Sequence, residues 1–456
     1  MRKLSLIAVG AIGICVLGAF YNRESTWQTL FDGKSLNGWK QVAGDANYAV
    51  EDGMIVGTTV RNTGNTFLIT EKEYGDFILE LDAKIEGEHN NSGIQTRSHI
   101  DLQANDGKGR VYGRQVEIDP TPRNWTGGVY DEARRNWLYT LELNPNAKAA
   151  YKEGQFNHFR IECIGNTTKT WVNDIPVSYV IDTLDNSGFI GLQVHSIGKE
   201  GKEGEKVFFK NIRIQTKDLQ PKKIEKQIYV VNLEPNSLSV DEEQSGYQLL
   251  YDGKTAANWI GANKNRFPDQ GWSYDDGELR VQATEGTDIP RAGDIVTEKL
   301  FSAFDLSFEF KLTPGANSGL KYFVTLDEKN KDWPLGLEYQ VLDDEKHPDA
   351  KMGRDGNRTL ASLYDILTAE KQARFLRPIG TWNNARIIAY PDSKVEHYLN
   401  GVKVLEYVRR SDAFKKMVSL SKFKDKPGFG EAKEGRILLQ DHGNEVSFRS
   451  IKIKEL

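Results

Sequence analysis

Apolar and polar residues alternate along the chain in many short stretches. The segments 77–85 (FILELDAKI), 114–118 (RQVEI) and 158–164 (HFRIECI) follow this pattern, and Gly, Asn or Asp separates many such stretches. A period of two is typical of β-strands with one buried face, and pairs such as Asp52-Gly53 are typical of tight hairpin turns. The pattern predicts an all-β fold of antiparallel strands in two packed sheets, a β-sandwich or jelly roll.

Two stretches depart from this alternation. Residues 131–139 (DEARRNWLY) and 363–373 (LYDILTAEKQA) look locally helical and fall at corresponding places in the two halves of the chain. We expect each to be a loop or a short helix at the rim of a sheet.

The same succession of sequence segments occurs twice along the chain. TLFDGKSLNGWK (29–40) returns as LLYDGKTAANWI (249–260), and later pieces of each half match in the same order. A period this long is too long for a solenoid and indicates duplication of a whole domain. We predict a first domain at 27–217, a second at 246–456, and a charged linker with two prolines at 218–245.

The N-terminus has the pattern of a targeting segment. Arg2 and Lys3 precede an apolar run that ends near residue 20 and is short for a membrane-spanning helix. We predict a signal peptide at 1–20, an extracytoplasmic, periplasmic location, and no transmembrane span once it is removed. A retained anchor and a lipid on Cys15 are the alternatives, although Ile14 stands where lipoprotein signals usually have a small residue.

Composition narrows the classes of partner. The net charge is −5 and no run of basic residues is present, which argues against a nucleic-acid binder. Cys163 is the only cysteine outside the leader, so no disulfide can form within the mature chain. Because Cys163 lies in an alternating stretch, we predict a buried structural thiol.

Candidate chemistry gathers on one predicted strand of the first domain. A period of two puts Gln115, Glu117 and Asp119 on one face, while Val116 and Ile118 point to the core. Acids, amides, guanidinium groups and aromatic rings in one place suit a polyhydroxylated ligand, whereas a merely solvated strand face is the simpler alternative. The neighbouring candidates are Gln95, Arg97, Trp125, Tyr130, Glu132, Arg134, Trp137 and His195.

The second domain has related but different candidates. Glu338 and Gln340 share a strand face, Tyr364 matches Tyr130, and His442 matches His195 in the repeated LQxH segment. Lys321 and Phe323 stand where the first domain has Gln95 and Arg97, so the two sites are not chemically equal. No zinc, phosphate-loop or dinucleotide motif is present, so we predict no cofactor, and a calcium ion on Asp and Asn oxygens stays open.

These motifs resemble the 3-keto-disaccharide hydrolase family. The likeness rests on LFDGKSLNGW, NSGIQTR, YGRQVEIDP, WTGGVYDEARR and GLQVH in the first half, and on NSGLKYF, GLEYQVLDD and HYLNGVKVLEY in the second. It implies two tandem concanavalin/glucanase-like jelly-roll domains. It also implies a hydrolase that acts on glycosides whose sugar carries a ketone at C3.

The implied chemistry assigns provisional roles. A C3 ketone acidifies the proton at C2, so a base can remove that proton and the anomeric oxygen then leaves. We expect Glu117 or His195 as the base, and the first domain as the catalytic one. The further expected roles are enolate stabilisation by Arg97 or Arg134, proton donation or orientation by Tyr130 or Asp119, and sugar binding by Trp125 and Trp137.

Two other functions remain open from the sequence. A carbohydrate-binding protein without turnover uses the same fold, and fold alone does not settle function. A conventional glycan hydrolase would use paired carboxylates instead of a C2 base. Carbohydrate is the ligand in all three cases.

Overall fold

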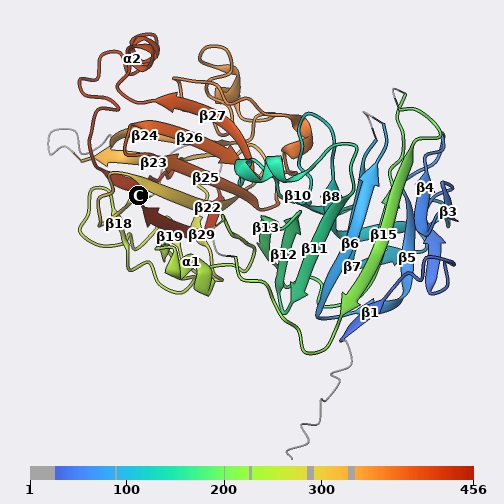
Figure 1. Cartoon of the computed structure of the whole chain (residues 1–456). Helices are drawn as coiled ribbons and strands as arrows, with labels where there is room; N and C mark the ends of the chain where they lie inside the picture. The colour runs from blue at the N-terminus through green and yellow to red at the C-terminus, as the bar shows by residue number, and fades with distance from the viewer. Residues whose placement is uncertain (1–25, 88–89, 200, 225–227, 285–291, 327–333) are drawn as a thin grey trace, which may run out of the picture.

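The computed structural model describes residues 26–87, 90–199, 201–224, 228–284, 292–326 and 334–456 (Figure 1). The predicted signal peptide at 1–20, with Cys15, lies outside the described residues. Within the described ranges, the few helices are all too short or too polar to cross a bilayer.

The first half of the chain forms two antiparallel sheets that pack face to face (Figure 1). One sheet has nine strands and the other has seven, and the core lies between them. The nine strands are β1 (Trp27–Thr29), β3 (Asn47–Glu51), β4 (Met54–Thr58), β6 (Phe77–Ile85), β11 (Asn157–Ile164), β12 (Thr167–Val172), β13 (Ile175–Ile181), β15 (Lys206–Gln215) and β16 (Val231–Asn232). The seven strands, in spatial order, are β10 (Asn136–Tyr139), β9 (Val129–Glu132), β8 (Arg110–Ile118), β7 (Ser92–Asp101), β14 (Gly188–Val194), β5 (Thr66–Tyr74) and β2 (Trp39–Val42). A 3₁₀ helix, η1 (Pro145–Ala150), follows β10.

The second half repeats this arrangement with an eight-stranded and a five-stranded sheet. The eight strands are β17 (Gln248–Leu249), β19 (Trp272–Ser273), β20 (Leu279–Val281), β22 (Phe304–Leu312), β25 (Asn383–Ala389), β26 (Lys394–Leu399), β27 (Val402–Val408) and β29 (Val446–Glu455). The five strands, in spatial order, are β18 (Trp259–Gly261), β21 (Ile295–Thr297), β28 (Arg436–Leu439), β23 (Asn317–Thr325) and β24 (Leu335–Leu342). The helical pieces are α1 (Val240–Gln244), η2 (Pro348–Lys351), η3 (Ala373–Phe375) and α2 (Asp412–Ser419).

The two smaller sheets correspond strand by strand. The order β8-β7-β14-β5-β2 in the first sandwich is matched by β24-β23-β28-β21-β18 in the second. The predicted all-β fold, a tandem pair of concanavalin/glucanase-like jelly rolls, is confirmed.

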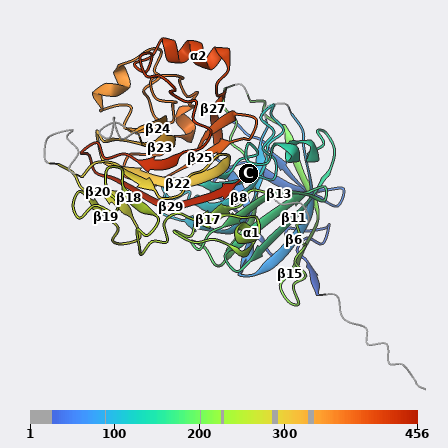
Figure 2. The ribbon, with the colours of Figure 1, turned by 90° about the vertical axis from the view of Figure 1, so that its left-hand side faces the viewer.

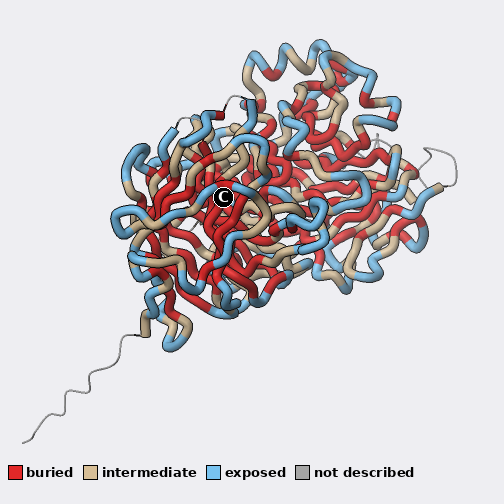
Figure 3. Tube along the Cα trace, turned by 90° about the vertical axis from the view of Figure 1, so that its right-hand side faces the viewer, coloured by how far each residue is buried: buried red, intermediate tan, exposed pale blue. Residues whose placement is uncertain are grey.

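Period-two burial explains why these segments form a sandwich. On β6, Phe77, Leu79 and Leu81 are fully buried in the core between the sheets, and Val116 of β8 meets them from the other side. Each such side chain contributes about 1.5–3 kcal/mol by leaving water. Cys163 is free and fully buried in the same core, as predicted. Figure 3 shows buried segments running through both sandwiches.

The loop or short helix expected at 131–139 is a strand hairpin in the structure. This segment forms the hairpin β9–β10, in which Asn136 pairs with Asp131. Ala133 and Asn136 have φ of 60° and 61°, in the left-handed region, which reverses the chain instead of continuing a helix. Residues 363–367 form isolated bridges, and the 3₁₀ helix η3 begins only at Ala373.

The two sandwiches are in direct contact (Figures 1 and 2). Strand β16, within the expected linker, runs parallel to β13, and the helix α1 follows it. The Tyr229 hydroxyl donates to Ser307 Oγ at 3.2 Å, and the Arg386 guanidinium lies 3.9 Å from the centre of the Tyr229 ring. Phe375 of the second sandwich packs into the core of the first, so the halves share apolar as well as polar contacts.

Candidate functional sites

A cavity of about 730 Å³ lies on the seven-stranded sheet of the first sandwich, on the face that points away from the core. We call it the first pocket. Strand β8 supplies its floor, the hairpin β9–β10 one wall, and the segment after β14 another. The predicted residues that line it are Gln115, Glu117, Tyr130, Glu132, Trp137 and His195.

Glu117 is the most strongly positioned acid of this pocket. Only 5% of the residue is exposed, and its carboxyl group accepts hydrogen bonds at both oxygens. Asn91 Nδ2 donates to Oε1 at 2.7 Å and Gln115 Nε2 donates to Oε2 at 3.0 Å. Burial raises the pKa of Glu117 to about 7, although the two amides favour the ionised form. The carboxyl group therefore changes charge near neutral pH.

A chain of amides holds Glu117 from below. Gln95 Nε2 donates to Gln115 Oε1 at 2.8 Å, and Ser98 Oγ donates to Gln95 Oε1 at 2.6 Å. Gln95 is fully buried beneath the pocket and does not form part of its lining, so it orients Gln115 instead of meeting a ligand.

Gly93 makes room for this chain. It pairs with Glu117 across β7 and β8, and a Cβ atom there would lie 2.2 Å from Gln115 Cδ. No side chain fits at such a distance, so a residue larger than glycine would displace Gln115 from Glu117.

His195 lies at the opposite wall. Its Nδ1 lies 2.6 Å from the Ser196 carbonyl oxygen, which can only accept, so Nδ1 carries the proton and Nε2 is left as an acceptor. Burial lowers the pKa of His195, which keeps the ring neutral at pH 7. The Ser196 amide donates to Asn65 Oδ1 at 2.9 Å, and Asn65 Nδ2 donates to Glu132 at 3.4 Å. Burial raises the pKa of Glu132 as well.

Aromatic rings form the third wall. Tyr130 and Trp137 pack edge to face with their ring centres 5.3 Å apart, and both line the pocket. Trp125 packs behind Trp137 at 4.8 Å and does not reach the lining, so it supports the wall and does not hold a ligand itself. Burial raises the pKa of Tyr130 to about 12, so its hydroxyl stays protonated and can donate.

Asp119 has a structural place. It is fully buried outside the pocket lining, where it accepts from the Trp125 amide at 3.2 Å and from Arg123 Nε at 2.7 Å. It thereby holds the loop after β8 and directs Arg123 into the pocket. The expected role of Asp119 at the substrate does not fit this position.

The expectation that Arg97 and Arg134 line the site is wrong. Arg97 sits on a β-bulge with φ of 47°, which breaks the period of two, and it bonds to Gly75, Gly165 and Asp76. Arg134 pairs with Asp131 and Asp185 at 2.7 and 2.6 Å, away from the lining of the first pocket.

The cations of the first pocket are different residues. Arg123 and Arg374 line it, together with Lys199. Arg123 stands in the sequence between the YGRQVEIDP and WTGGVYDEARR motifs, so its place in the loop was within reach of sequence reasoning. Arg374 comes from the second sandwich, and no local sequence pattern signals its place.

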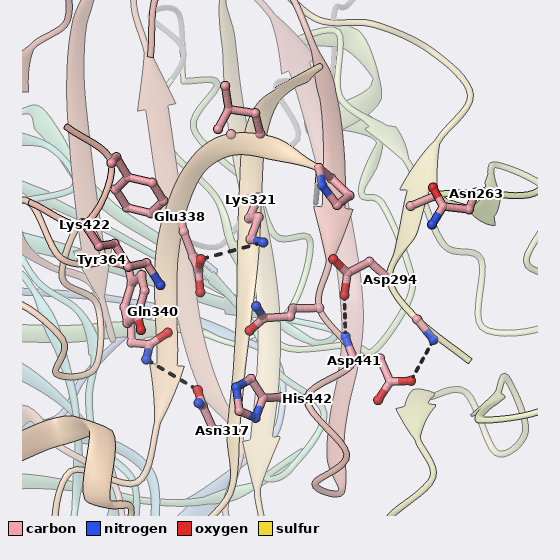
Figure 4. Close-up of a pocket in the computed structure, with 17 residues that line it drawn as sticks. Asn263, Asp294, Asn317, Lys321, Glu338, Gln340, Tyr364, Lys422, Asp441 and His442 are labelled. Atoms are coloured by element: carbon pink, nitrogen blue, oxygen red, sulfur yellow. Dashed lines mark hydrogen bonds and ion pairs between the residues drawn. The ribbon is translucent and has the colours of Figure 1, made fainter. Parts of the chain in front are cut away.

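A second pocket of about 340 Å³ lies on the matching sheet of the second sandwich (Figure 4). All four predicted residues line it, namely Glu338, Gln340, Tyr364 and His442. Sequence reasoning missed further charged residues of its lining, which are Asp294, Lys422 and Asp441.

The second pocket has its acid at another position. Glu338 Oε2 lies 3.9 Å from Lys321 Nζ, and burial raises the pKa of Glu338 against this positive charge. Gln340 Nε2 lies 3.4 Å from Asn317 Oδ1, and turning this amide by 180° would let it donate to Glu338 Oε1 at 3.2 Å. An ion pair thus takes the place of the amide chain of the first pocket.

The arrangement of acidic, imidazole and thiol side chains determines whether a pocket can hold a metal ion. In the ranges that the structure describes, no group of three or more His, Cys, Asp or Glu side chains has a metal-binding arrangement. The donors of both pockets are instead amides, hydroxyls and cations, which suit hydrogen bonding to a hydroxylated ligand.

Comparison with known proteins assigns both halves of the chain to one family. The sequence pattern of the 3-keto-alpha-glucoside-1,2-lyase-like domain matches residues 26–215 and again residues 246–454. The chain is 37% identical over 244 residues to the 3-keto-disaccharide hydrolase of Bacteroides thetaiotaomicron, and this match spans 49% of the chain and 83% of that protein.

Solved structures of similar chains come from Parabacteroides distasonis. One candidate glycosyl hydrolase is 30% identical, with 49% of this chain and 100% of that chain covered and a TM-score of 0.43. Another is 25% identical, with 46% and 99% covered and a TM-score of 0.36.

Proposed function

Since this chain belongs to the family of 3-keto-alpha-glucoside-1,2-lyase-like domains, twice over, we propose that it hydrolyses glycosides and disaccharides whose sugar carries a ketone at C3. It is a hydrolase of glycosidic bonds, and the ketone at C3 is the feature that it would require. The first pocket is where we place the reaction.

The proposed reaction has two stages. A base takes the proton from C2, the electron pair of that bond forms an enolate on the C3 oxygen, and the enolate expels the leaving group from C1 as a C1–C2 double bond forms. The leaving oxygen takes up a proton. The C3 ketone re-forms as the leaving group departs. Water then adds its hydroxyl to C1 and a proton to C2, which saturates the C1–C2 double bond and gives the free 3-keto sugar.

The observation that carries this proposal is the state of Glu117. It is a buried carboxyl group with a pKa of about 7, fixed by Asn91 and Gln115 in a pocket large enough for a sugar. A general base works best when its pKa lies near the working pH. His195, neutral and with Nε2 as an acceptor, is the other candidate base, and in the second stage it can accept a proton from the water that adds to C1.

The remaining groups support the charged intermediate. Arg123 and the protonated hydroxyl of Tyr130 are the cation and the neutral donor available for the enolate oxygen and the leaving oxygen. Trp137 offers an apolar ring to the face of the sugar. Arg97, Arg134 and Asp119 take no part in this scheme.

A conventional glycan hydrolase is the second candidate, because Glu132 lines the same pocket as Glu117. Two carboxyl groups with raised pKa in one cavity fit acid–base hydrolysis of an ordinary glycoside. A carbohydrate-binding protein without turnover would bind its ligand with the same residues of the first pocket.

One experiment separates the three functions. The protein is incubated with 4-nitrophenyl 3-keto-α-glucoside and with the unoxidised glucoside, in deuterated water, and products are followed by NMR spectroscopy. Release from the keto compound alone, with deuterium at C2, supports the proposal. Equal release from both compounds supports the conventional hydrolase, and binding without release supports the binding protein.

We also propose that the protein acts outside the cytoplasm. This rests on the charged start and apolar run of residues 1–20 alone. Mass spectrometry of the protein recovered from fractionated cells tests it, since an unprocessed N-terminus in the cytoplasmic fraction would rule it out.

A further inference from the structure

Part of the first pocket is built by the second sandwich. Arg374 lies on η3 and lines the pocket that contains Glu117. Asn400 Nδ2 donates to the carbonyl of the neighbouring Phe375 at 3.0 Å, and the Thr140 hydroxyl of the first sandwich donates to the carbonyl of Gly401, the residue after Asn400. The contact between the sandwiches thus sets where Arg374 stands.

Aromatic packing continues this contact to the pocket. Phe375 is 8% exposed and its ring centre lies 5.4 Å from that of Trp125. The Arg374 guanidinium lies 4.7 Å from the centre of the Phe375 ring, and the Arg123 guanidinium lies 4.6 Å from that of Trp125. One guanidinium therefore lies on each member of this aromatic pair, and both line the same cavity.

The charges of the two arginines are not balanced in the same way. Arg123 pairs with Asp119 at 2.7 Å. Arg374 Nε donates to the neutral amide oxygen of Gln372 at 2.9 Å, and no carboxylate in the described ranges forms an ion pair with Arg374. Burial and the positive charge of Arg123 lower the pKa of Arg374. The described lining of the pocket holds three cations, Arg123, Arg374 and Lys199, and two carboxyl groups, those of Glu117 and Glu132, whose pKa is raised by burial. The side of the pocket that carries the two guanidinium groups therefore attracts an anion.

We propose that Arg374 is a specificity-determining residue of the first pocket and that it binds a carboxylate on the part of the substrate that lies outside the sugar ring, while Arg123 stays available for the oxygens of the reacting sugar. This inference rests on the proposed function and adds the class of substrate, namely 3-keto-glycosides with an acidic aglycone or an acidic second sugar. A guanidinium group presents a planar fork that matches the two oxygens of a carboxylate.

The test compares two substrates that differ only in charge. Full-length protein is assayed with 4-carboxyphenyl 3-keto-α-glucoside and with the 4-carbamoylphenyl compound, which is neutral and of similar size. We expect the wild type to prefer the acid, with a KM about tenfold lower, as for one well-placed ion pair. Arg374→Ala should remove this preference by raising KM for the acid about tenfold, while kcat changes by less than about twofold.

Two further variants control for charge and folding. Arg374→Lys keeps the charge but loses the fork, so it should keep only part of the preference. Arg266→Ala removes an arginine that is 71% exposed in its side chain and pairs with Asp269, and it should behave as the wild type. The preference should also decline as salt is raised from about 0.05 to 0.5 M.

The outcomes separate this inference from the proposed function. If the wild type turns over both compounds without preferring the acid, or if Arg374→Ala keeps the preference, the role of Arg374 is overturned and the proposed function stands. If the wild type turns over neither compound, the proposed function fails. Calorimetric binding of the two compounds then decides on Arg374, since equal affinity of wild type and Arg374→Ala for the acid would overturn its role.

Discussion

Glu117 and Gln340 occupy the same position in the two sandwiches. Glu117 pairs across the sheet with Gly93, and Gln340 pairs with Gly319 at the same point of the repeated Asn-Ser-Gly segment. Two residue pairs further along the strands, Gln115 faces Gln95 and Glu338 faces Lys321. The acid and the amide have thus exchanged places between the two pockets, which share a fold but not a base at the same point.

The first prediction follows from this exchange. Replacing Glu117 by Gln keeps the shape of the side chain and removes the base, so kcat/KM for a 3-keto-glucoside should fall by about 10²–10⁴. The matched change in the second pocket, Glu338→Gln, should leave the rate within about twofold. Steady-state kinetics on both variants check this, and a loss of rate in Glu338→Gln alone would move the reaction to the second pocket.

Period-two alternation placed Gln115 and Glu117 correctly because strand β8 is regular at these residues. Val116 and Ile118 enter the core, and Gln115 and Glu117 face the pocket, as alternation requires. The same reasoning failed at Arg97, because the β-bulge at this residue directs its side chain away from the pocket. Phe323, at the corresponding place of the second sandwich, has φ of 53°, so the bulge itself is repeated. A bulge of this kind leaves no mark in the alternation of the sequence.

Arg374 shows the other limit of sequence reasoning. The pattern of each repeat describes how one sandwich packs on itself, and it contains nothing about the contact between two sandwiches. The place of Phe375 beside Trp125 arises from that contact. Residues that complete a pocket from a neighbouring unit become visible only once the units are placed together.

The second prediction concerns the pH dependence of the rate. A base must be deprotonated to act, so with Glu117 as the base kcat/KM should rise as the pH increases through about 7 and then level off. An acid catalyst would give the opposite slope. With His195 as the base the rise should lie below pH 6.5, since burial lowers its pKa. Rates measured from pH 5 to 9 distinguish the two residues, and the rise near 7 should be absent in the residual activity of Glu117→Gln.

The third prediction concerns the stability of the protein. Burial raises the folded-state pKa of Glu117 to about 7 from its ordinary value of 4.5, so the folded protein holds this proton more tightly than the unfolded chain. The contribution of this carboxyl group to the free energy of unfolding is therefore fully present below pH 4.5. It is lost as the pH rises through about 7. At pH 8 the Glu117→Gln variant should be more stable than the wild type by about 3 kcal/mol, and at pH 4 the two should agree. Urea denaturation at both pH values measures the difference, and a constant offset would contradict it.

The fourth prediction tests the amide chain under the base. Gly93→Ala would place a Cβ atom 2.2 Å from Gln115 Cδ, so Gln115 must move and release Glu117. We expect a loss of about 1–3 kcal/mol in stability and a fall in kcat larger than the change in KM. Gly64→Ala is the control, because nothing lies within 4 Å of a Cβ atom there. A Gly93→Ala protein with the wild-type rate would show that the orientation of Gln115 does not matter.

The fifth prediction addresses Lys321 and Glu338, whose charged groups lie 3.9 Å apart in the second pocket. Both residues are less than 10% exposed, so removing the carboxylate leaves a buried ammonium group without its opposite charge. Glu338→Gln should therefore lower stability by about 1–3 kcal/mol. The double variant Lys321→Met/Glu338→Gln should recover most of this loss, because no uncompensated charge remains. Thermal and urea unfolding of the two single variants and the double variant form a complete cycle, which isolates the coupling between the two residues.

If the Glu338→Gln variant is as stable as the wild type, water reaches this pair and screens it. The acid of the second pocket would then be free to act on a ligand, and the difference between the two pockets would be smaller than their residues indicate.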